Sequence, residues 1–194
     1  MREVIYYIAT TLDGFIAHED GSFNGFSWDD EFIAHLLSEF PETIPAHLKE
    51  GTGSNNQMKV FDAVLMGRNT YEIGLKQGIT NPYPNLNQYV FSRSMDKSPD
   101  KNITLISDNA LETVKTLKNK TGKAIWLCGG SNLAGQLLEE HLIDSLIIKM
   151  NPVLFGSGIQ LFSGSKNLIK LSLTECKQFD SGHVLLYYQV NQTD

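Results

Sequence analysis

One stretch of the chain, residues 124–142, constrains the fold most, because it joins an apolar strand to an amphipathic helix through two glycines. The run Ile125-Trp126-Leu127-Cys128 is apolar, and Gly129-Gly130 follows it directly. Apolar residues then recur with the spacing of a helix that buries one face, at Leu133, Leu137, Leu138 and Leu142. This order predicts a strand, a tight turn and a helix with Ser131 as its N-cap.

The start of such a helix can bind an anion. Its first N–H groups have no partner within the helix, and the positive end of the helix dipole lies there. Neighbouring glycines also let a phosphate approach the backbone closely. Glycines follow many strands simply as tight connections, so Gly129-Gly130 by itself leaves both interpretations open.

Strands and helices alternate along most of the sequence. Apolar runs predict strands at residues 4–9, 62–66, 88–92, 103–106, 124–128 and 145–150. Helical patterns begin near residues 28, 70, 109 and 131. Two last strands, 168–177 and 183–190, flank Asp180-Ser181-Gly182, a sequence that suits a hairpin turn. The pattern predicts an α/β fold in which helices flank a mostly parallel central sheet that ends in a C-terminal antiparallel hairpin.

Two segments lack a regular pattern. Residues 10–27 carry several glycines and scattered aromatic side chains, which predicts a long loop able to fold over a ligand. Ser27 and Asp30 are spaced as a capping box for the helix that follows. Residues 41–57 are rich in Pro, Gly, Ser and Asn, and this composition predicts an insertion-like connection.

Length, charge and cysteine use exclude several classes of protein. A chain of 194 residues without a polar low-complexity stretch is expected to form a single domain over residues 1–194. The net charge of −6 argues against broad binding to nucleic acid or to an anionic membrane. No apolar run suits a signal peptide or a membrane span, which favours a cytoplasmic protein. Cys128 and Cys176 are expected to be buried thiols, and no metal site is predicted.

Three strand ends carry groups suited to a polyphosphate. Gly67-Arg68-Asn69-Thr70 follows one predicted strand, Ser92-Arg93 ends the next, and Gly129-Gly130-Ser131 follows a third. They offer backbone N–H groups, hydroxyls and guanidinium groups, and a guanidinium fork suits a phosphate dianion. The alternative is that Arg68 and Arg93 are solvated surface charges.

With these motifs in this order, the sequence resembles the dihydrofolate reductase-like family. It is most similar to the branch related to the C-terminal reductase domain of riboflavin-biosynthesis bifunctional deaminase/reductases. The resemblance covers nearly the whole chain, and it implies a dihydrofolate reductase-like domain that forms a homodimer. The segments that carry it are Leu12-Asp13-Gly14-Phe15-Ile16-Ala17, Met66-Gly67-Arg68-Asn69-Thr70-Tyr71, Phe91-Ser92-Arg93, Gly129-Gly130-Ser131, and Pro152-Val153-Leu154-Phe155-Gly156-Ser157-Gly158 with Leu161-Phe162.

The resemblance implies that NADPH binds across the carboxyl edge of the sheet, under the loop after the first strand. Ala9 would meet the carboxamide, Ser92 and Arg93 the 2′-phosphate, and residues 129–133 the pyrophosphate. Because NADH lacks the 2′-phosphate, the resemblance also implies that the protein prefers NADPH to NADH. The implied cofactor-binding positions are Ala9, Gly14, Gly67, Arg68, Asn69, Thr70, Ser92, Arg93, Gly129, Gly130, Ser131, Asn132 and Leu133.

The proton donor is harder to assign. Reduction of a C=N or C=O bond needs a proton source near the acceptor. Dihydrofolate reductases use a carboxylate on the first helix, several residues after a tryptophan that Trp28 resembles, and the same count here reaches the apolar Ile33. Glu31 and Asp30 are therefore the candidate catalytic acids. The alternative is that they are first-turn acids that complement the helix dipole.

Two further residues have open roles. Asp13 leaves the first strand beside the expected cofactor, although an Asp-Gly turn is the favoured interpretation. Lys149 could lie with Ile147 and Asn151 on one face of its strand and meet an anionic substrate, or it could lie on a solvent face.

The sequence thus predicts a cytoplasmic, NADPH-dependent oxidoreductase that transfers a hydride to a small heterocyclic or carbonyl-bearing metabolite. One candidate acceptor is a pyrimidine ribosylamino phosphate of riboflavin biosynthesis, as for a 5-amino-6-(5-phosphoribosylamino)uracil reductase. The alternatives are dihydrofolate reduction and a protein that binds NADP(H) without catalysis.

Overall fold

The structure is a computed structural model that describes residues 1–49 and 57–191. Within these residues, an eight-stranded sheet runs through the molecule and a second sheet has two short strands. In spatial order the large sheet consists of β5 (Ile103–Ile106), β4 (Asn87–Phe91), β3 (Phe61–Gly67), β6 (Ala124–Gly129), β1 (Val4–Thr11), β7 (Ser145–Asn151), β10 (Val184–Val190) and β9 (Leu171–Gln178). The small sheet pairs β2 (Phe15–Ala17) with β8 (Ile159–Gln160).

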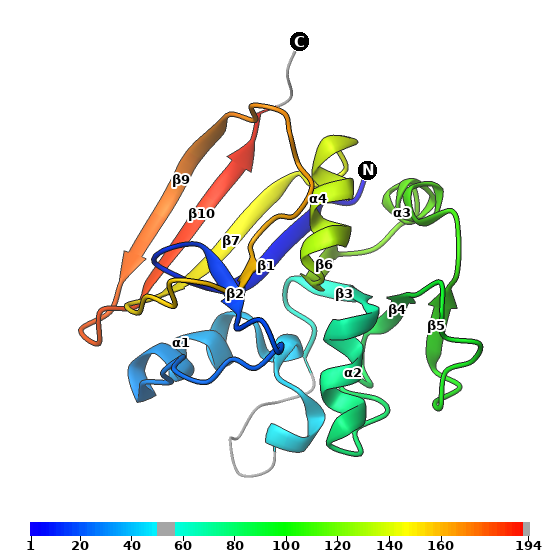
Figure 1. Cartoon of the computed structure of the whole chain (residues 1–194), viewed down its shortest axis with the longest axis horizontal. Helices are drawn as coiled ribbons and strands as arrows, with labels where there is room; N and C mark the ends of the chain where they lie inside the picture. The colour runs from blue at the N-terminus through cyan, green and yellow to red at the C-terminus, as the bar shows by residue number, and fades with distance from the viewer. Residues whose placement is uncertain (50–56, 192–194) are drawn as a thin grey trace.

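The large sheet is mostly parallel. β1 pairs in parallel with β6 and with β7, β6 pairs with β3, and β4 lies between β3 and β5. β10 is antiparallel to β7 and to β9. Figure 1 shows the β9–β10 hairpin at one edge of the sheet and β5 at the other. The predicted fold class, including the C-terminal antiparallel hairpin, is therefore confirmed.

Helices cover both faces of this sheet (Figure 1). The side chain of Tyr7 points to one face and packs with Phe32 of the first helix, whereas Tyr6 points to the other and packs with Leu137. Successive side chains of a strand face opposite ways, so β1 contributes to both halves of the core. The first face carries α1 (Asp30–Glu39) and α2 (Arg68–Lys76), and the second carries α3 (Ala110–Lys118) and α4 (Ser131–Glu139).

The segment 10–27 contains regular structure that its sequence does not indicate. β1 continues to Thr11, and β2 then pairs with β8, which lies far along the chain. The connection after α1 begins with two short 3-10 helices, η1 (Pro41–Thr43) and η2 (Ala46–Leu48). The rest of that predicted connection, up to residue 56, lies outside the described residues.

The predicted capping box of α1 is wrong. The N-cap is Asp29, whose carboxylate accepts hydrogen bonds from the N–H groups of Glu31, at 3.0 Å, and Phe32, at 3.3 Å. The Ser27 hydroxyl lies instead 3.2 Å from Nε2 of His183. A carboxylate one residue before the helix satisfies two N–H groups, so the helix begins there.

Other strands and helices begin or end a few residues away from the bounds that the sequence predicts. The last strand pair begins at Leu171 rather than at residue 168, and α4 ends at Glu139 although Leu142 is still buried. Cys176 is exposed on β9 rather than buried, because β9 is the edge strand of the sheet. Within the described residues, no helix combines the length and the apolar composition that a membrane crossing needs.

Candidate active site

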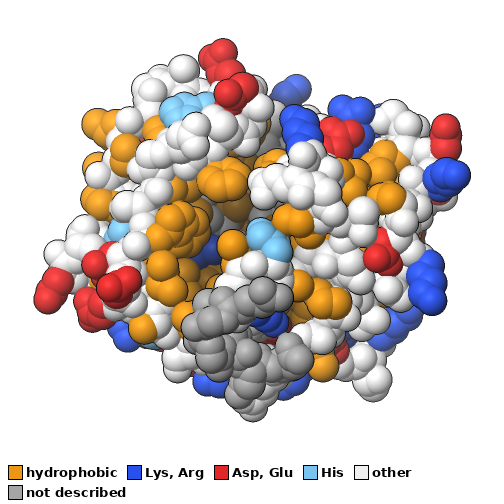
Figure 2. Space-filling view, turned by 90° about the horizontal axis from the view of Figure 1, so that it is seen from below, with side chains coloured by type: hydrophobic (Ala, Val, Ile, Leu, Met, Phe, Trp, Pro, Cys, Tyr) orange, Lys and Arg blue, Asp and Glu red, His pale blue; other side chains and the backbone are white. Residues whose placement is uncertain are grey.

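A cavity of about 1770 Å³ opens along the carboxyl edge of the parallel strands. Residues from the ends of β1, β3, β4, β6 and β7 line it, together with one side of α1 and the loop after β2. Figure 2, a view from below, shows hydrophobic side chains gathered around a hollow. Ligand crevices of α/β folds lie at this edge, and the volume exceeds that of a pocket for one small molecule. The cavity therefore has room for two ligands.

The starts of α2 and α4 touch each other at this cavity. A Cβ built on Gly67 would lie 3.2 Å from the Cα of Gly130, and a Cβ on Gly130 would lie 3.1 Å from the Cα of Gly67. Gly130 also has a φ of +108°, a conformation that residues with a side chain rarely adopt. β3 and β6 are neighbours in the sheet, so two glycine-to-helix junctions far apart in sequence form one unit.

Ser131 does not cap α4 as predicted. Gly130 is the N-cap and Ser131 is the first residue of the helix. The Ser131 hydroxyl has no hydrogen-bond partner among the described residues, although only 8% of the residue is exposed. No described side chain caps α2 or α4. A buried hydroxyl beside unpaired helix N–H groups is suited to a ligand oxygen, and above all to a phosphate.

Arg68 and Arg93 are exposed at the rim of the same cavity. Nη1 of Arg68 donates a hydrogen bond to the Ser94 hydroxyl at 2.9 Å, and its Nε lies 3.6 Å from the Glu72 carboxylate. The buried hydroxyl of Ser92 accepts a hydrogen bond from the N–H of Ser94 and so shapes the turn after β4. The structure brings the three predicted phosphate-binding motifs to one place, because β4, β3 and β6 are adjacent.

All the predicted cofactor positions except Gly14 line this cavity. Ala9 lies at the end of β1, between β6 and β7. Gly14 lies in the turn between β1 and β2 with a φ of +85°, and its carbonyl accepts a hydrogen bond from the N–H of Leu161 at 2.9 Å. Gly14 therefore supports the loop rather than the cavity wall.

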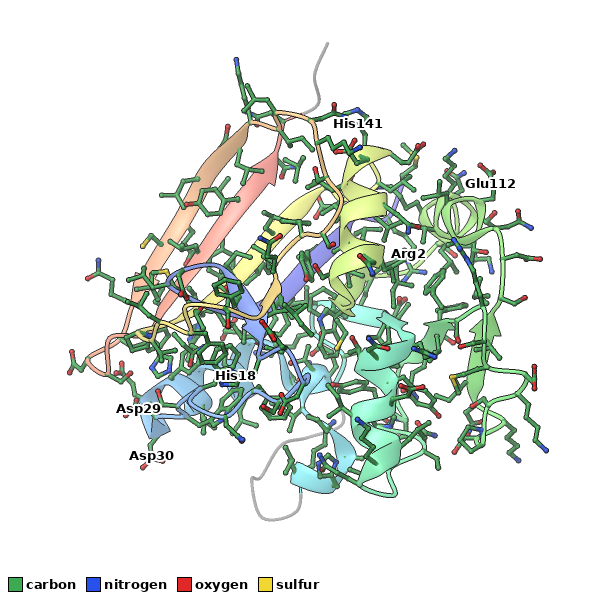
Figure 3. The ribbon with its side chains drawn as sticks, viewed as in Figure 1. Arg2, His18, Asp29, Asp30, Glu112 and His141 are labelled. Atoms are coloured by element: carbon green, nitrogen blue, oxygen red, sulfur yellow. The ribbon has the colours of Figure 1, made fainter. Side chains whose placement is uncertain are left out.

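The candidate acids Asp30 and Glu31 do not lie where the sequence predicts them. Both are exposed, and neither lines the cavity. Figure 3 shows Asp29 and Asp30 at the outer end of α1. The helix turns an apolar side, which includes Ile33 and Leu36, toward the cavity. The structure favours the alternative in which these acids complement the helix dipole.

Lys149 lines the cavity, although its sequence context leaves its role open. Its Nζ lies 4.0 Å from the centroid of the Tyr7 ring, and both residues line the cavity. Burial lowers the pKa of Lys149 from 10.5 to about 8, and the nearby Cys128 acts in the opposite direction. The sequence left open whether the side chain of Lys149 faces a substrate or solvent. In the structure it faces the cavity.

The Cys128 thiol near Lys149 and the Tyr83 phenol beside that thiol are uncharged at neutral pH. Burial raises the pKa of the Cys128 thiol to about 11. Sγ of Cys128 lies 3.9 Å from the Tyr83 hydroxyl, and burial raises the pKa of Tyr83 as well. This part of the cavity therefore carries one ammonium beside a neutral thiol and neutral phenols.

Asp13 joins the turn after β1 to the segment after β7. Its carboxylate accepts hydrogen bonds from the N–H groups of Gly156 at 2.8 Å and Phe155 at 3.2 Å, and from the Thr11 hydroxyl at 2.5 Å. These bonds, that of Thr11 first, lower the pKa of Asp13. The favoured interpretation, a structural turn, agrees with these contacts.

In the described part of the chain, no group of three or more His, Cys, Asp or Glu side chains is placed to hold a metal ion.

The sheet order and the cavity define a class of protein, the dihydrofolate reductase-like reductase fold. Residues 2–185 match the family model of the RibD C-terminal domain, and the chain belongs to this family of reductase-like domains.

Relatives from one bacterium match over nearly their full length. The chain is 37% identical to the Bacillus subtilis (strain 168) protein YwjB over 190 residues, which cover 96% of this chain and 97% of YwjB. It is 28% identical to YyaP of the same strain over 201 residues, which cover 98% of this chain and 96% of YyaP.

Solved structures share the fold at lower identity. A putative riboflavin biosynthesis protein from Shewanella sp. PV-4 superimposes with a TM-score of 0.70 at 23% identity, over 99% of this chain and 100% of that one. Dihydrofolate reductase from Enterococcus faecalis, complexed with NADP(H) and RAB-propyl, gives a TM-score of 0.63 at 18% identity, over 98% and 97% of the two chains.

Proposed function

We propose that the protein is an NADPH-dependent oxidoreductase that reduces a small heterocyclic or carbonyl-bearing metabolite. The observation that carries the proposal is the meeting of two uncapped helix starts within the described chain, next to the unpartnered hydroxyl of Ser131, in a cavity that Arg68 and Arg93 also line. A dinucleotide with a 2′-phosphate matches this set of donors. The related dihydrofolate reductase is a complex with NADP(H), which supports the same cofactor.

Each group of residues has a stated task in this proposal. NADPH, when bound, supplies the hydride. The starts of α2 and α4 hold the pyrophosphate, and Ser92 and Arg93 hold the 2′-phosphate. The backbone at Ala9 meets the carboxamide, and the loop between β1 and α1 excludes water. The remaining volume, between α1 and the end of β7, receives the acceptor.

Of the possible activities, dihydrofolate reduction fits least well. Ile33 lines the cavity at the position where the resemblance implies a carboxylate, and Asp30 and Glu31 are outside the cavity lining. The family and the Shewanella relative, a putative riboflavin biosynthesis protein, support a pyrimidine of that pathway as a candidate acceptor.

The cofactor is tested by titrating the protein with NADPH and with NADH and following fluorescence. We expect tighter binding of NADPH, and Arg93→Ala should weaken it about tenfold while NADH binding stays unchanged, because one charge-assisted phosphate contact is lost. Lys101→Ala removes an exposed cation outside the cavity and serves as the matched control. Equal affinity for the two nucleotides, or no binding of either, would contradict the proposal.

Catalysis is tested by following NADPH absorbance with a panel of acceptors. The panel contains dihydrofolate, the riboflavin-pathway pyrimidine and aromatic carbonyl compounds. We expect oxidation of NADPH with a member of the last two classes and none with dihydrofolate. If NADPH binds but no compound of the panel causes its oxidation, the result would favour a protein that binds NADP(H) without catalysis.

We also propose that the protein is a homodimer that pairs through β9. In the described sheet β9 has a neighbour on one side only, and it exposes Leu171 to 41% and Leu173 to 54%. Leu168, just before the strand, is 82% exposed. An edge strand with an apolar surface and unpaired backbone groups tends to pair with another chain, and a second copy offers the same surface.

A further inference from the structure

We propose that Lys149 binds the hydride acceptor, and that this acceptor is a flat aromatic molecule carrying a carboxylate or carbonyl oxygen rather than a sugar phosphate. The inference rests on the proposed function, because it names the acceptor class for the part of the cavity that the cofactor would leave open. Of the candidate acceptors, it selects an aromatic carbonyl compound over the phosphorylated pyrimidine of the riboflavin pathway.

The first argument is that, among the described residues, no acidic partner is found for the Lys149 ammonium. Lys115 and Lys118, by contrast, form ion pairs with Glu112 and Asp144. The contact recorded for Nζ of Lys149 is the face of the Tyr7 ring. An ammonium has three N–H donors, and an aromatic face does not replace the hydrogen bonds that they make in water. A ligand oxygen in the cavity would accept them.

The second argument is the position of the ammonium. Lys149 is the β7 residue that lines the cavity, and β7 lies beside β1, whose Tyr7 and Ala9 line it too. Trp126 and Cys128 of β6 line it from the other side of β1. The cation therefore stands at the centre of the sheet edge, next to the expected nicotinamide position at Ala9. An ammonium there stabilises the negative charge that an oxygen gains as its bond to carbon is reduced.

The third argument is the apolar part of the cavity lining. α1 contributes three aliphatic side chains, and the segment after α1 adds further apolar side chains. The loop after β2 lines the cavity with aromatic side chains and with Glu19 and Asp20. Flat rings gain from burial against apolar side chains. Those of α1 and of the segment after it are Ile33, Leu36, Leu37, Ile44, Pro45 and Leu48.

The fourth argument is the placement of positive charge. The basic residues among the described lining are Arg68, Lys76, Arg93 and Lys149. Arg68 and Arg93 belong to the proposed cofactor site, and Lys76 is exposed at the end of α2. Residues 50–56 of the sequence contain no Lys or Arg. A phosphate with two negative charges is commonly held by arginines or a helix start, and both are assigned to the cofactor.

The experiment measures binding of three probes to the full chain by intrinsic fluorescence, because Trp126 lines the cavity. The probes are 2-naphthoate, its neutral analogue 2-naphthamide, and ribose 5-phosphate. We expect 2-naphthoate to bind more tightly than ribose 5-phosphate. Lys149→Met should weaken the binding of 2-naphthoate at least about tenfold, since one charged contact is lost. The affinity for 2-naphthamide should change by no more than about twofold.

Lys76→Met is the matched control, because it removes a lysine from the exposed mouth of the same cavity. It should leave all three affinities within about twofold. Thermal melting of both variants checks the fold, and Lys149→Gln provides a second neutral side chain should Lys149→Met fail to fold.

An NADPH titration in parallel separates this inference from the proposed function. If neither NADPH nor NADH binds, the proposed function fails. The binding of 2-naphthoate to the parent protein and to Lys149→Met still tests whether Lys149 binds a carboxylate. If NADPH binds but 2-naphthoate affinity is the same in Lys149→Met, the inference alone is overturned. Tighter binding of ribose 5-phosphate than of 2-naphthoate would overturn it as well.

Discussion

The buried ammonium of Lys149 lowers the stability of the folded protein. Burial lowers its pKa from 10.5 to about 8, which means that the folded protein holds this proton less tightly than the unfolded chain does. Between these two values the unfolded state binds more protons, so this group makes stability rise with pH there. Below about pH 8 the full cost of the buried ammonium is present. Such a cost is expected at a site that keeps a charge ready for a ligand.

Lys149→Met is therefore expected to stabilise the protein while it weakens ligand binding. At pH 7 the free energy of unfolding should rise by about 1–3 kcal/mol, and the gain should shrink as the pH approaches 10.5. Urea unfolding at pH 7 and pH 10 measures both values. The Cys128 thiol and Lys149 shift each other's pKa, so the value at pH 7, where the thiol is protonated in both proteins, is the primary measurement. Lys76→Met should change stability little at either pH, and a loss of stability in Lys149→Met would contradict the expectation.

Gly67 and Gly130 illustrate how a single residue type serves both fold and site. Either residue with a Cβ would press on the backbone of the other at 3.1–3.2 Å, and Gly130 has a positive φ in addition. The sequence identified both positions as glycines before helices. It did not indicate that they touch, because their contact depends on the neighbouring positions of β3 and β6 in the sheet.

At the scale of elements, the loop after β1 is held by partners from the other half of the chain. β2 pairs with β8, and the Asp13 carboxylate accepts hydrogen bonds from the N–H groups of Phe155 and Gly156. The ring of His18 stacks on that of Phe155 with centroids 3.9 Å apart. These contacts attach the loop that would cover the nicotinamide to the segment after β7, so the two should move together.

Asp13→Ala is expected to loosen this attachment. Hydrogen exchange at the amides of Phe155 and Gly156 should become faster, because their carboxylate acceptor is gone. In the parent protein the hydrogen bonds lower the pKa of Asp13 below its ordinary 3.8, so the protection should persist above that pH and be lost as the pH falls through the lowered value. Asp20→Ala is the control, since the Asp20 carboxylate binds the local N–H of Ser22. Unchanged exchange in Asp13→Ala would count against this role.

α1 shows where an element can be predicted and its orientation cannot. Its apolar stripe and its end at Pro41 are visible in the sequence, and the helix forms there. The position of its first turn relative to the cavity depends on packing against β1 and β10, which a single helix pattern does not contain. For this reason Asp30 and Glu31 were reasonable candidates by residue type and still lie outside the cavity lining.

At the scale of the whole molecule, the β9 edge is the surface that the proposed dimer would cover. Leu173→Lys should convert the dimer to a monomer, because it puts a charge in place of one of the two exposed leucines of the edge strand. Sedimentation equilibrium measures the mass in solution. Leu12→Lys is the control, since Leu12 is also an exposed leucine, at 62%, and lies far from β9 in the sheet order. A parent protein that is monomeric at all concentrations would refute the proposed dimer.

The sequence by itself determined the strands and helices of the large sheet, the three motifs predicted to bind phosphate, and the family. These properties depend on local periodicity and on short motifs, which neighbouring residues encode. The tertiary structure alone decided that the motifs meet, that β2 pairs with β8, that Ser131 is left with an unpartnered hydroxyl in the described chain, and that Lys149 faces a cavity. Each of these depends on the order of strands in the sheet, which brings together residues that no local pattern connects.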